Sequence, residues 1–149
     1  MYHAVKSDFE KVKEIFYLHK KWFPHVRTDY MKRMIAKKNL ILENDVVITY
    51  NFYKRKQKIG DVQAFKSDCI LHQIVAKTKG TASDVLQRFF KFVNHNPLGR
   101  RVYLSVRSDN EMAKNFYLKN NMKLIGKTSW SKGTLPGDVF VYDPWTYET

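Results

Sequence analysis

The chain has 149 residues, and its 27 Lys and Arg against 14 Asp and Glu give a formal net charge of +13 at pH 7. This length suits one domain, over residues 1–149, that buries enough apolar surface to fold without disulfides or a structural metal. The lone Cys69 excludes an intramolecular disulfide and a zinc site built on Cys pairs. The positive charge indicates an anionic ligand or partner.

Membrane and secreted classes do not fit the sequence. No apolar run approaches the roughly 18 residues of a membrane span, and the N-terminal residues lack the apolar centre of a signal peptide. The His and carboxylate residues show no metal-ligand spacing. We therefore expect a cytoplasmic protein with no membrane partner and no metal site.

The first segment predicts a strand followed by two helices. Residues 2–5 are interpreted as a strand, and Ser7-Asp-Phe-Glu10 matches a capping box. Apolar residues at helical spacing predict a helix over about 8–21. Pro24 ends this helix, and Thr28 begins a second one.

The next segment predicts a β-hairpin. Residues 40–43 and 46–53 are strand-like, and Asn44-Asp45 is a turn pair between them. The basic tract 54–60 interrupts the pattern, and we interpret it as a loop leading to an apolar strand over 69–75.

Helices and strands alternate over the remaining residues. We expect helices over 82–94 and 110–120 and strands over 102–106, 122–128 and 139–142. Residues 129–138 are a predicted loop, which would either shape an acceptor site or serve as a plain connection. This order predicts an α/β class, or an α+β mixed sheet.

The most informative motif is Lys77-Thr-Lys-Gly80-Thr-Ala82, between the apolar strand and the helix after it. A short strand-to-helix loop with Gly gathers free backbone N–H groups and the positive end of a helix dipole, which suits a phosphate group. The loop matches neither a Walker loop nor a Rossmann fingerprint. A glycine at such a junction is also often only a structural turn.

The loop resembles the pyrophosphate loop of the GCN5-related N-acetyltransferases, the GNAT superfamily, whose pattern is Gln/Arg-x-x-Gly-x-Gly/Ala. A second motif in the right order, Asn110-x-x-Ala113-x-x-x-Tyr117, is similar to the helix that follows in that family. The resemblance is specific over about 69–126 and only topological over 1–68. Lys77 replaces the usual Gln or Arg, the loop is shorter than usual, and Asn121-Met122 replaces the frequent Gly-Phe.

This resemblance implies the GNAT acyl-CoA N-acyltransferase fold, with a central, mostly antiparallel sheet flanked by helices. It implies acetyl-CoA as the cofactor and transfer of its acetyl group to an amine acceptor by direct attack. Residues carried over to the cofactor site are Ile74, Val75 and Ala76 for the pantetheine arm, Lys77, Lys79, Gly80, Thr81, Ala82 and Ser83 for the pyrophosphate, and Asn110 and Tyr117 on the second helix.

Two residues are candidates for proton transfer. The resemblance makes Tyr117 the acid that protonates the leaving thiolate, although it could simply anchor its helix to the sheet. In many relatives a Glu on this strand acts as the general base, whereas this chain has His72 and Gln73 there. His72 titrates near neutrality and could be the general base. A His in an apolar strand is also often only packed, and Asp68 is a weaker candidate.

The net charge motivates an alternative, a nucleic-acid-binding or base-modifying module on the same fold. The Lys and Arg residues are spread along the chain, which describes a solubilising surface equally well. The C-terminal strand and the segment Trp145-Thr-Tyr147 could also pair two copies in a homodimer.

Overall fold

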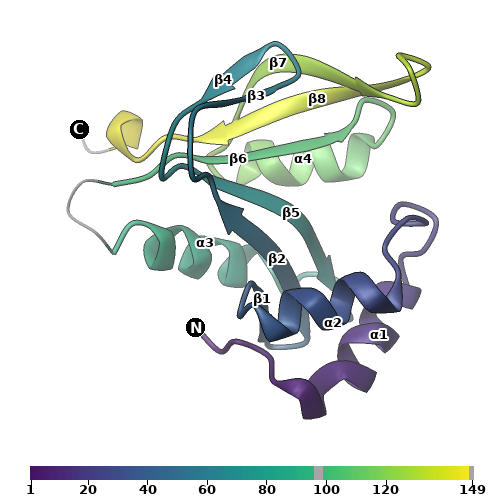
Figure 1. Cartoon of the computed structure of the whole chain (residues 1–149). Coiled ribbons are helices and arrows are strands. Elements are labelled where there is room, and N and C mark those ends of the chain that lie inside the picture. Colours follow the sequence, from purple (N-terminus) through teal and green to yellow (C-terminus); the bar gives the residue numbers. More distant parts are fainter. Residues whose placement is uncertain (96–98, 148–149) are drawn as a thin grey trace. The chain divides into compact units, whose positions relative to one another are not determined.

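Two β-sheets and the helices around them make up the computed structural model, which describes residues 1–95 and 99–147 (Figure 1). The strands are β1 (Leu40–Glu43), β2 (Val46–Phe52), β3 (Gln57–Ile59), β4 (Val62–Ala64), β5 (Cys69–Ala76), β6 (Val102–Arg107), β7 (Lys123–Trp130) and β8 (Leu135–Tyr142). The helices are η1 (Lys6–Asp8), α1 (Phe9–Tyr17), α2 (Thr28–Ala36), α3 (Ala82–Val93), α4 (Glu111–Lys119) and η2 (Pro144–Tyr147), where η marks a 3₁₀ helix.

The larger sheet has the strand order β1-β2-β5-β6-β8-β7, and the smaller one is the hairpin β3–β4. The β5–β6 pair is parallel, and the pairs β1–β2, β6–β8 and β7–β8 are antiparallel. The predicted class, a mixed and mostly antiparallel sheet flanked by helices, is confirmed.

The chain forms two compact units. Unit 1 comprises Met1–Tyr50 and His72–Phe89, and unit 2 comprises Asn51–Leu71 and Phe90–Thr149. Strands β2 and β5 and helix α3 contribute residues to both units.

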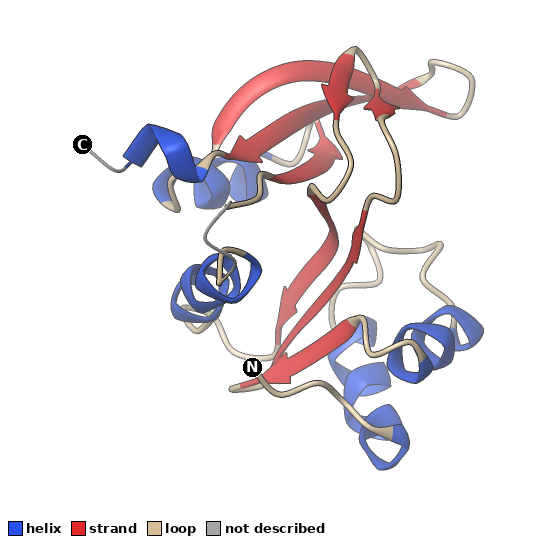
Figure 2. Cartoon of the chain, turned by 60° about the vertical axis from the view of Figure 1, so that its left-hand side comes forward, coloured by secondary structure: helices blue, strands red, loops and turns tan. Residues whose placement is uncertain are grey.

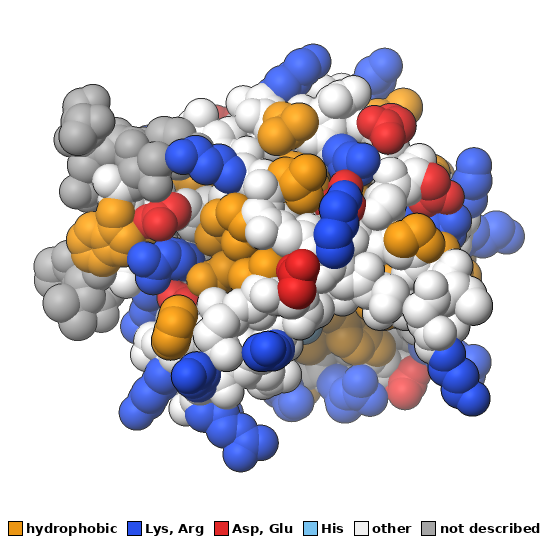
Figure 3. All heavy atoms as spheres, turned by 90° about the horizontal axis from the view of Figure 1, so that it is seen from above, with side chains coloured by type: hydrophobic (Ala, Val, Ile, Leu, Met, Phe, Trp, Pro, Cys, Tyr) orange, Lys and Arg blue, Asp and Glu red, His pale blue; other side chains and the backbone are white. Residues whose placement is uncertain are grey.

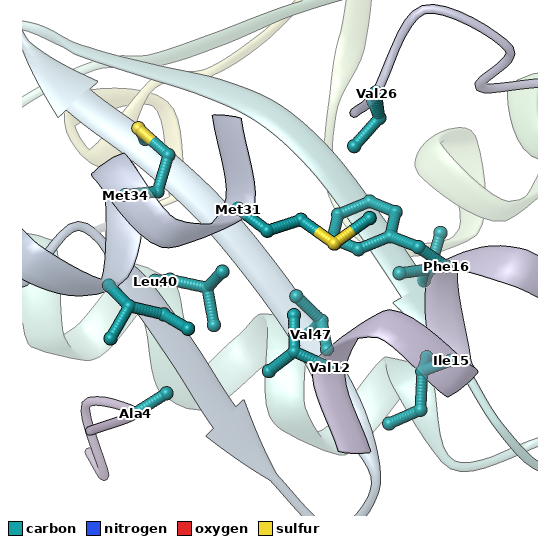
Figure 4. Packing of buried hydrophobic residues seen from close by; sticks show 11 residues of the cluster. Ala4, Val12, Ile15, Phe16, Val26, Met31, Met34, Leu40 and Val47 are labelled. Atoms are coloured by element: carbon teal, nitrogen blue, oxygen red, sulfur yellow. The ribbon is translucent and has the colours of Figure 1, made fainter. Parts of the chain in front are cut away.

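Within unit 1, α1 and α2 cover one face of the strands and α3 covers the other (Figure 2). The inward faces of α1 and α2 carry apolar residues three or four positions apart, the spacing of one helix face. They meet residues of the strands in one buried cluster (Figure 4), whose members include Val12, Ile15, Phe16, Met31, Met34, Ile35, Leu40, Val47 and Val75. Burying one large apolar side chain contributes about 1.5–3 kcal/mol, so this cluster holds the unit together.

The N-terminal predictions need correction. The expected strand over 2–5 is a single bridge between His3 and Ile41. The Ser7–Glu10 capping box is also wrong, because the chain first makes a 3₁₀ turn in which the Asp8 carboxylate accepts the amide of Val5 at 2.8 Å. The helix ends at Tyr17, four residues early, because the amides of His19 and Trp22 bond three residues back, as in a 3₁₀ turn.

The predicted hairpin of β1 and β2 is confirmed. Asn44 and Asp45 both have left-handed backbones, with φ of 48° and 59°. This is the conformation that a two-residue turn needs when it joins twisted antiparallel strands.

The basic tract is not a plain loop, because it contains strand β3, which pairs with β4. The sequence prediction was wrong here because β3 and β4 have only three residues each, too few for an alternation of apolar and polar residues to be recognised. Ile59 and Val62 face a small buried cluster that includes Ala64, Tyr103 and Val141. Beside the turn of this hairpin, the Asp61 amide donates to the Lys127 carbonyl at 3.0 Å and the Asp61 carboxylate accepts the Lys127 amide at 2.8 Å.

In unit 2 the two faces of the β6–β8 pair carry different partners. Tyr103 pairs with Val141, and both belong to the cluster under the β3–β4 hairpin. The next pair along, Leu104 with Phe140, points to the opposite face because side chains alternate along a strand. There the Phe140 ring lies 5.8 Å from the ring of Tyr117 on α4.

The predicted loop over 129–138 is wrong. Ser129 pairs with Pro136 and Trp130 with Leu135, so β7 and β8 continue almost to their common turn. Strand β8 lies between β6 and β7, so this C-terminal strand has no free edge with which to pair two copies. After α4, Asn121 has φ of 68° and Met122 is buried, as expected for the pair that replaces Gly-Phe.

Replacing Gly60 with Ala should destabilise the fold by about 2 to 4 kcal/mol. Gly60 has φ of 59°, and a Cβ there would overlap the Lys127 carbonyl oxygen and come within 2.6 Å of the Thr128 Cβ. The change in the free energy of unfolding can be measured with urea.

Gly133 provides a matched control. Its φ is 87°, but a Cβ there would meet no atom within 4 Å. Gly133→Ala should therefore cost only the backbone strain, about 1 kcal/mol. Equal losses for the two variants would show that the contact with β7 does not matter.

Candidate active site

The strand-to-helix loop begins with Lys77, which is already engaged in two ways. Its amide donates to the Asp45 carbonyl at 2.9 Å, and its ammonium group lies 3.1 Å from Glu14 Oε1. Both partners belong to unit 1. The amide of Lys77 is therefore occupied within the protein, and its charge is shared with a carboxylate of α1.

The rest of the loop leads into α3. Gly80 has φ of 91°, and a Cβ there would meet no atom within 4 Å. The Thr81 hydroxyl donates to the Thr78 carbonyl at 2.8 Å, and Ala82 is the first residue of the helix. The side chain of Lys79 is exposed. The loop thus has an open side above Gly80 at a helix N-terminus, where the first amides lack partners within the helix.

Ile74, Val75 and Ala76 end strand β5 just before this loop. Val75 is buried in the core of unit 1, and Ile74 and Ala76, which point to the other side, are half-buried. The Ala76 carbonyl lies 2.8 Å from Nε2 of His19, in the turn after α1. The end of β5 is therefore fixed to the C-terminal end of α1.

His72 lies on the same side of β5 as Ile74 and Ala76. Its side chain is accessible to solvent, yet the protein atoms around the ring remove part of its hydration, and this desolvation lowers its pKa. The imidazole is neutral at pH 7, the form that can accept a proton.

Asn110 and Tyr117 belong to α4 in unit 2. Asn110 is the N-cap of the helix, and its side-chain oxygen accepts the Ala113 amide at 3.1 Å. Tyr117 is buried, with its ring 5.5 Å from that of Phe116, and no side-chain hydrogen bond of its hydroxyl is found among the described residues. Desolvation raises the pKa of Tyr117, so its hydroxyl keeps its proton at neutral pH.

The residues named from the sequence fall into two sets. In unit 1, His72 and the predicted cofactor residues from Ile74 to Ser83 lie on one continuous segment, which runs from β5 through the loop into α3. Unit 2 carries Asn110 and Tyr117, seven residues apart and therefore on one side of α4.

Solved structures resemble this chain over nearly its whole length. An acetyltransferase of the GNAT family from Bacillus cereus matches with a TM-score of 0.69 and 17% identity, over 94% of this chain and 93% of that one. NAA60 from Arabidopsis thaliana, solved in complex with acetyl-CoA, matches with a TM-score of 0.68 and 15% identity, over 95% and 96%. The chain has the GNAT fold.

Acetyl transfer is not the only activity described for neighbours with this fold. GphF, a GNAT-like decarboxylase solved in complex with isobutyryl-CoA, matches with a TM-score of 0.68 and 11% identity, over 95% of this chain and 97% of that one. By sequence, no protein-family model and no curated protein matches the chain. The likeness therefore rests on the fold.

One polar cluster of this GNAT fold was missed from the sequence. Asp138 on β8 is fully buried, and its Oδ1 accepts hydrogen bonds from Lys127 at 2.7 Å and from Ser108 at 2.8 Å. The Lys114 ammonium lies 3.1 Å from Oδ2, an ion pair without hydrogen-bond geometry. The four residues belong to separate segments, the turn after β6, α4, β7 and β8, so no motif spacing could have indicated the cluster.

Opposing effects set the charge of Asp138. Desolvation by burial disfavours the carboxylate, but the hydrogen bonds from Lys127 and Ser108 and the attraction of Lys114 outweigh it. Together they lower the pKa of Asp138 to about 2. The carboxylate is ionised at neutral pH and joins β7, β8 and the start of α4 within unit 2.

The surface charge does not gather in one place on the face that Figure 3 shows. Lys and Arg side chains are separated there by neutral, hydrophobic and acidic ones. Within residues 1–95 and 99–147, no group of three or more His, Cys, Asp or Glu could hold a metal ion. No helix in the described part of the chain is long and apolar enough to cross a bilayer.

The Asp138 cluster should make the free energy of unfolding depend on pH in the acid range. The folded pKa of about 2 lies below the ordinary value of about 4, so this contribution is full above about pH 4 and is lost as the pH falls toward 2. Asp138→Asn should cost about 2 kcal/mol near pH 6. Urea unfolding of both proteins between about pH 2 and 6 measures this, and the difference should shrink as the pH falls.

Asp109→Asn is the control, because Asp109 makes an exposed ion pair with Arg107 at 2.8 Å. Exposed pairs contribute about 0–1 kcal/mol. If the loss caused by Asp138→Asn were the same at every pH, the ionised carboxylate would not be the stabilising group.

Proposed function

We propose that this chain is a member of the GNAT superfamily that transfers the acetyl group of acetyl-CoA to an amine acceptor by direct attack. The observation that carries the proposal is the strand–loop–helix of residues 69–93 in a chain with the GNAT fold. In this segment the left-handed Gly80 leaves open space at the first turn of α3. A diphosphate could approach the loop backbone at this point.

The residues present fit this cofactor. The amides of Lys79, Gly80, Thr81 and Ala82 would hold the pyrophosphate at the positive end of α3, with the exposed Lys79 adding charge. Ser83 follows in the first turn of the helix. The exposed side of β5 at Ile74 and Ala76 would hold the pantetheine arm. When bound, acetyl-CoA supplies the acetyl group as a thioester.

Lys77, which the family motif assigns to the pyrophosphate, already has two partners within the protein. Its ammonium group is paired with Glu14, and its amide with Asp45. We infer that Lys77 positions the start of the loop against α1 and the β1–β2 turn. Lys79 then remains as the lysine that can contact the pyrophosphate directly.

Direct attack requires a neutral amine and a proton for the leaving thiolate. A lysine-like amine, with a pKa of about 10.4, is almost entirely protonated at neutral pH. His72, whose pKa is lowered, is neutral and would accept the proton of the amine. Tyr117, whose pKa is raised, keeps its hydroxyl proton and would donate it to the thiolate. Asn110 would support the cofactor site by fixing the start of α4.

Acetyl-CoA should raise the thermal midpoint of the protein. At about 100 times its dissociation constant a ligand adds roughly 2.7 kcal/mol, or about 5 to 10 °C for a chain of this size. Gly80→Val should remove the rise, because a side chain would fill the open space above the loop. Scanning calorimetry with and without acetyl-CoA measures both.

Gly133→Val is the matched control, since Gly133 also has a left-handed backbone and open space. It carries the same strain but lies in the β7–β8 turn, so the rise with acetyl-CoA should persist. If the wild-type midpoint did not move, or if both variants lost the rise equally, the loop would not be the cofactor site.

Substitutions at the two proton-transfer residues should have separate effects. Tyr117→Phe should lower kcat about 100-fold or more while leaving acetyl-CoA affinity within about twofold, because only the acid is removed. His72→Gln should remove the decline of kcat/KM toward acid pH that protonation of the imidazole causes in the wild type. Thiol release can be followed across pH with the best amine from a panel of amino-acid amides, peptides and polyamines.

Tyr103→Phe is the control for the loss of a buried phenol in unit 2. Tyr103 belongs to the cluster under the β3–β4 hairpin and not to α4, so its variant should retain wild-type kcat. Unchanged turnover in Tyr117→Phe would exclude the acid role, and an unchanged acid limb in His72→Gln would exclude the base role.

A further inference from the structure

An open cavity of about 860 Å³ lies where α1 leads through a loop into α2, entirely within unit 1. Its volume is in the range of small-molecule sites. Phe16 and Val26 line it and are themselves buried members of the unit's core, and Figure 4 shows both side chains within that cluster. The exposed Tyr17 and the half-buried Phe23 add aromatic surface.

The charged side chains of this cavity are all positive. Lys20, Lys21 and Arg27 line it, no Asp or Glu does, and all three are exposed. No salt bridge to any of them is found within the described residues, and the Lys21 ammonium group lies 5.1 Å from the centre of the Trp22 ring. Elsewhere in unit 1, Lys11 and Arg88 lie 2.6 Å and 2.7 Å from carboxylates.

This combination specifies a class of ligand. Three like charges around one cavity repel one another, and an anion bound between them would remove that cost. The apolar lining favours a group that brings aromatic or aliphatic surface. A ligand that fits both has a carboxylate or phosphate next to an apolar group.

Contacts within unit 1 connect the cavity to the end of β5. His19, next to Lys20, has its Nε2 2.8 Å from the Ala76 carbonyl, and Glu14 on α1 is paired with Lys77. The C-terminal part of α1, which supplies Phe16 and Tyr17 to the cavity, is therefore fixed to the segment where the cofactor arm and pyrophosphate are proposed to bind.

We propose that this cavity binds the acceptor and selects an amine that carries a carboxylate or phosphate beside an aromatic or aliphatic group. As a statement about the acceptor, this rests on the proposed acetyl transfer. As a statement about the ligand class of the cavity, it rests on the lining residues alone.

The test compares acceptors that differ in charge. Acetylation is measured with the C-terminally amidated dipeptides Glu-Phe, Gln-Phe and Lys-Phe, whose blocked C-terminus carries no carboxylate, and with tyramine phosphate against tyramine. We expect kcat/KM for at least one anionic acceptor to exceed that of its neutral counterpart by about tenfold or more, the effect of one good charge-assisted contact. The dipeptides and the tyramines distinguish a peptide source from a small-molecule source of the anion.

The triple variant Lys20→Gln, Lys21→Gln, Arg27→Gln should remove this preference, so that its kcat/KM for the anionic acceptor falls to within about twofold of that for the neutral one. The matched control replaces Lys6, Lys32 and Lys37 with Gln, which removes the same charge from unit 1 outside the cavity. It should keep the preference. Equal use of anionic and neutral acceptors by the wild type, a preference for Lys-Phe, or equal losses in both triple variants would overturn the proposal.

A binding experiment separates this proposal from the proposed function. The amidated dipeptides Glu-Phe and Gln-Phe and tyramine phosphate are titrated into the wild type and both triple variants by calorimetry without cofactor. If no amine is acetylated but an anionic probe binds and only the cavity variant loses it, the acetyltransferase is refuted and the ligand class stands. If neither anionic probe binds better than Gln-Phe and no acceptor preference exists, the cavity does not select anions.

Discussion

The parallel pairing of β5 with β6 is the constraint on which the rest of this structure depends. Cys69 pairs with Val102 and Ile70 with Tyr103, so the chain must return to the same end of the sheet before β6 begins. Parallel neighbours need such a crossover, and here it runs through α3. The end of β5 is therefore followed directly by a loop and a helix N-terminus. The proposed diphosphate site follows from this connection before any individual side chain is considered.

A buried polar network then fixes which side of β5 faces the core of unit 1. Gln73 is buried, and its side-chain oxygen accepts hydrogen bonds from the hydroxyls of Thr49 on β2 and Tyr30 on α2, the latter at 2.9 Å. A strand shifted by one residue would leave these groups unpaired in the interior, which is costly. His72 and Ile74 are thus kept on the opposite side of the strand, away from that core.

The sequence was informative where local patterns decide the structure. Helical spacing predicted α2 and α3, Asn44-Asp45 predicted a tight turn, and the loop around Gly80 was found from its position between strand and helix. It was uninformative where distant partners decide. Part of the basic tract forms a strand because Ile59 and Val62 pack against the cluster that contains Tyr103. Asp138 pairs with Lys114 and Lys127 only because the fold brings β7, β8 and α4 together. The spacing of residues along the sequence does not reveal such contacts between separate segments.

The contact of Asp61 with Lys127 has a consequence for the behaviour of the protein at high concentration. Strand β7 is the outer strand of its sheet, and Leu124, Ile125 and Trp130 on it are exposed. An unpaired outer strand of this kind can recruit a strand from another molecule. Asp61 occupies both backbone groups of Lys127 in the middle of β7, and the hairpin that carries it begins in a run of positive charge. The β3–β4 hairpin thus blocks part of the outer edge of β7 and hinders its pairing with a strand of another molecule.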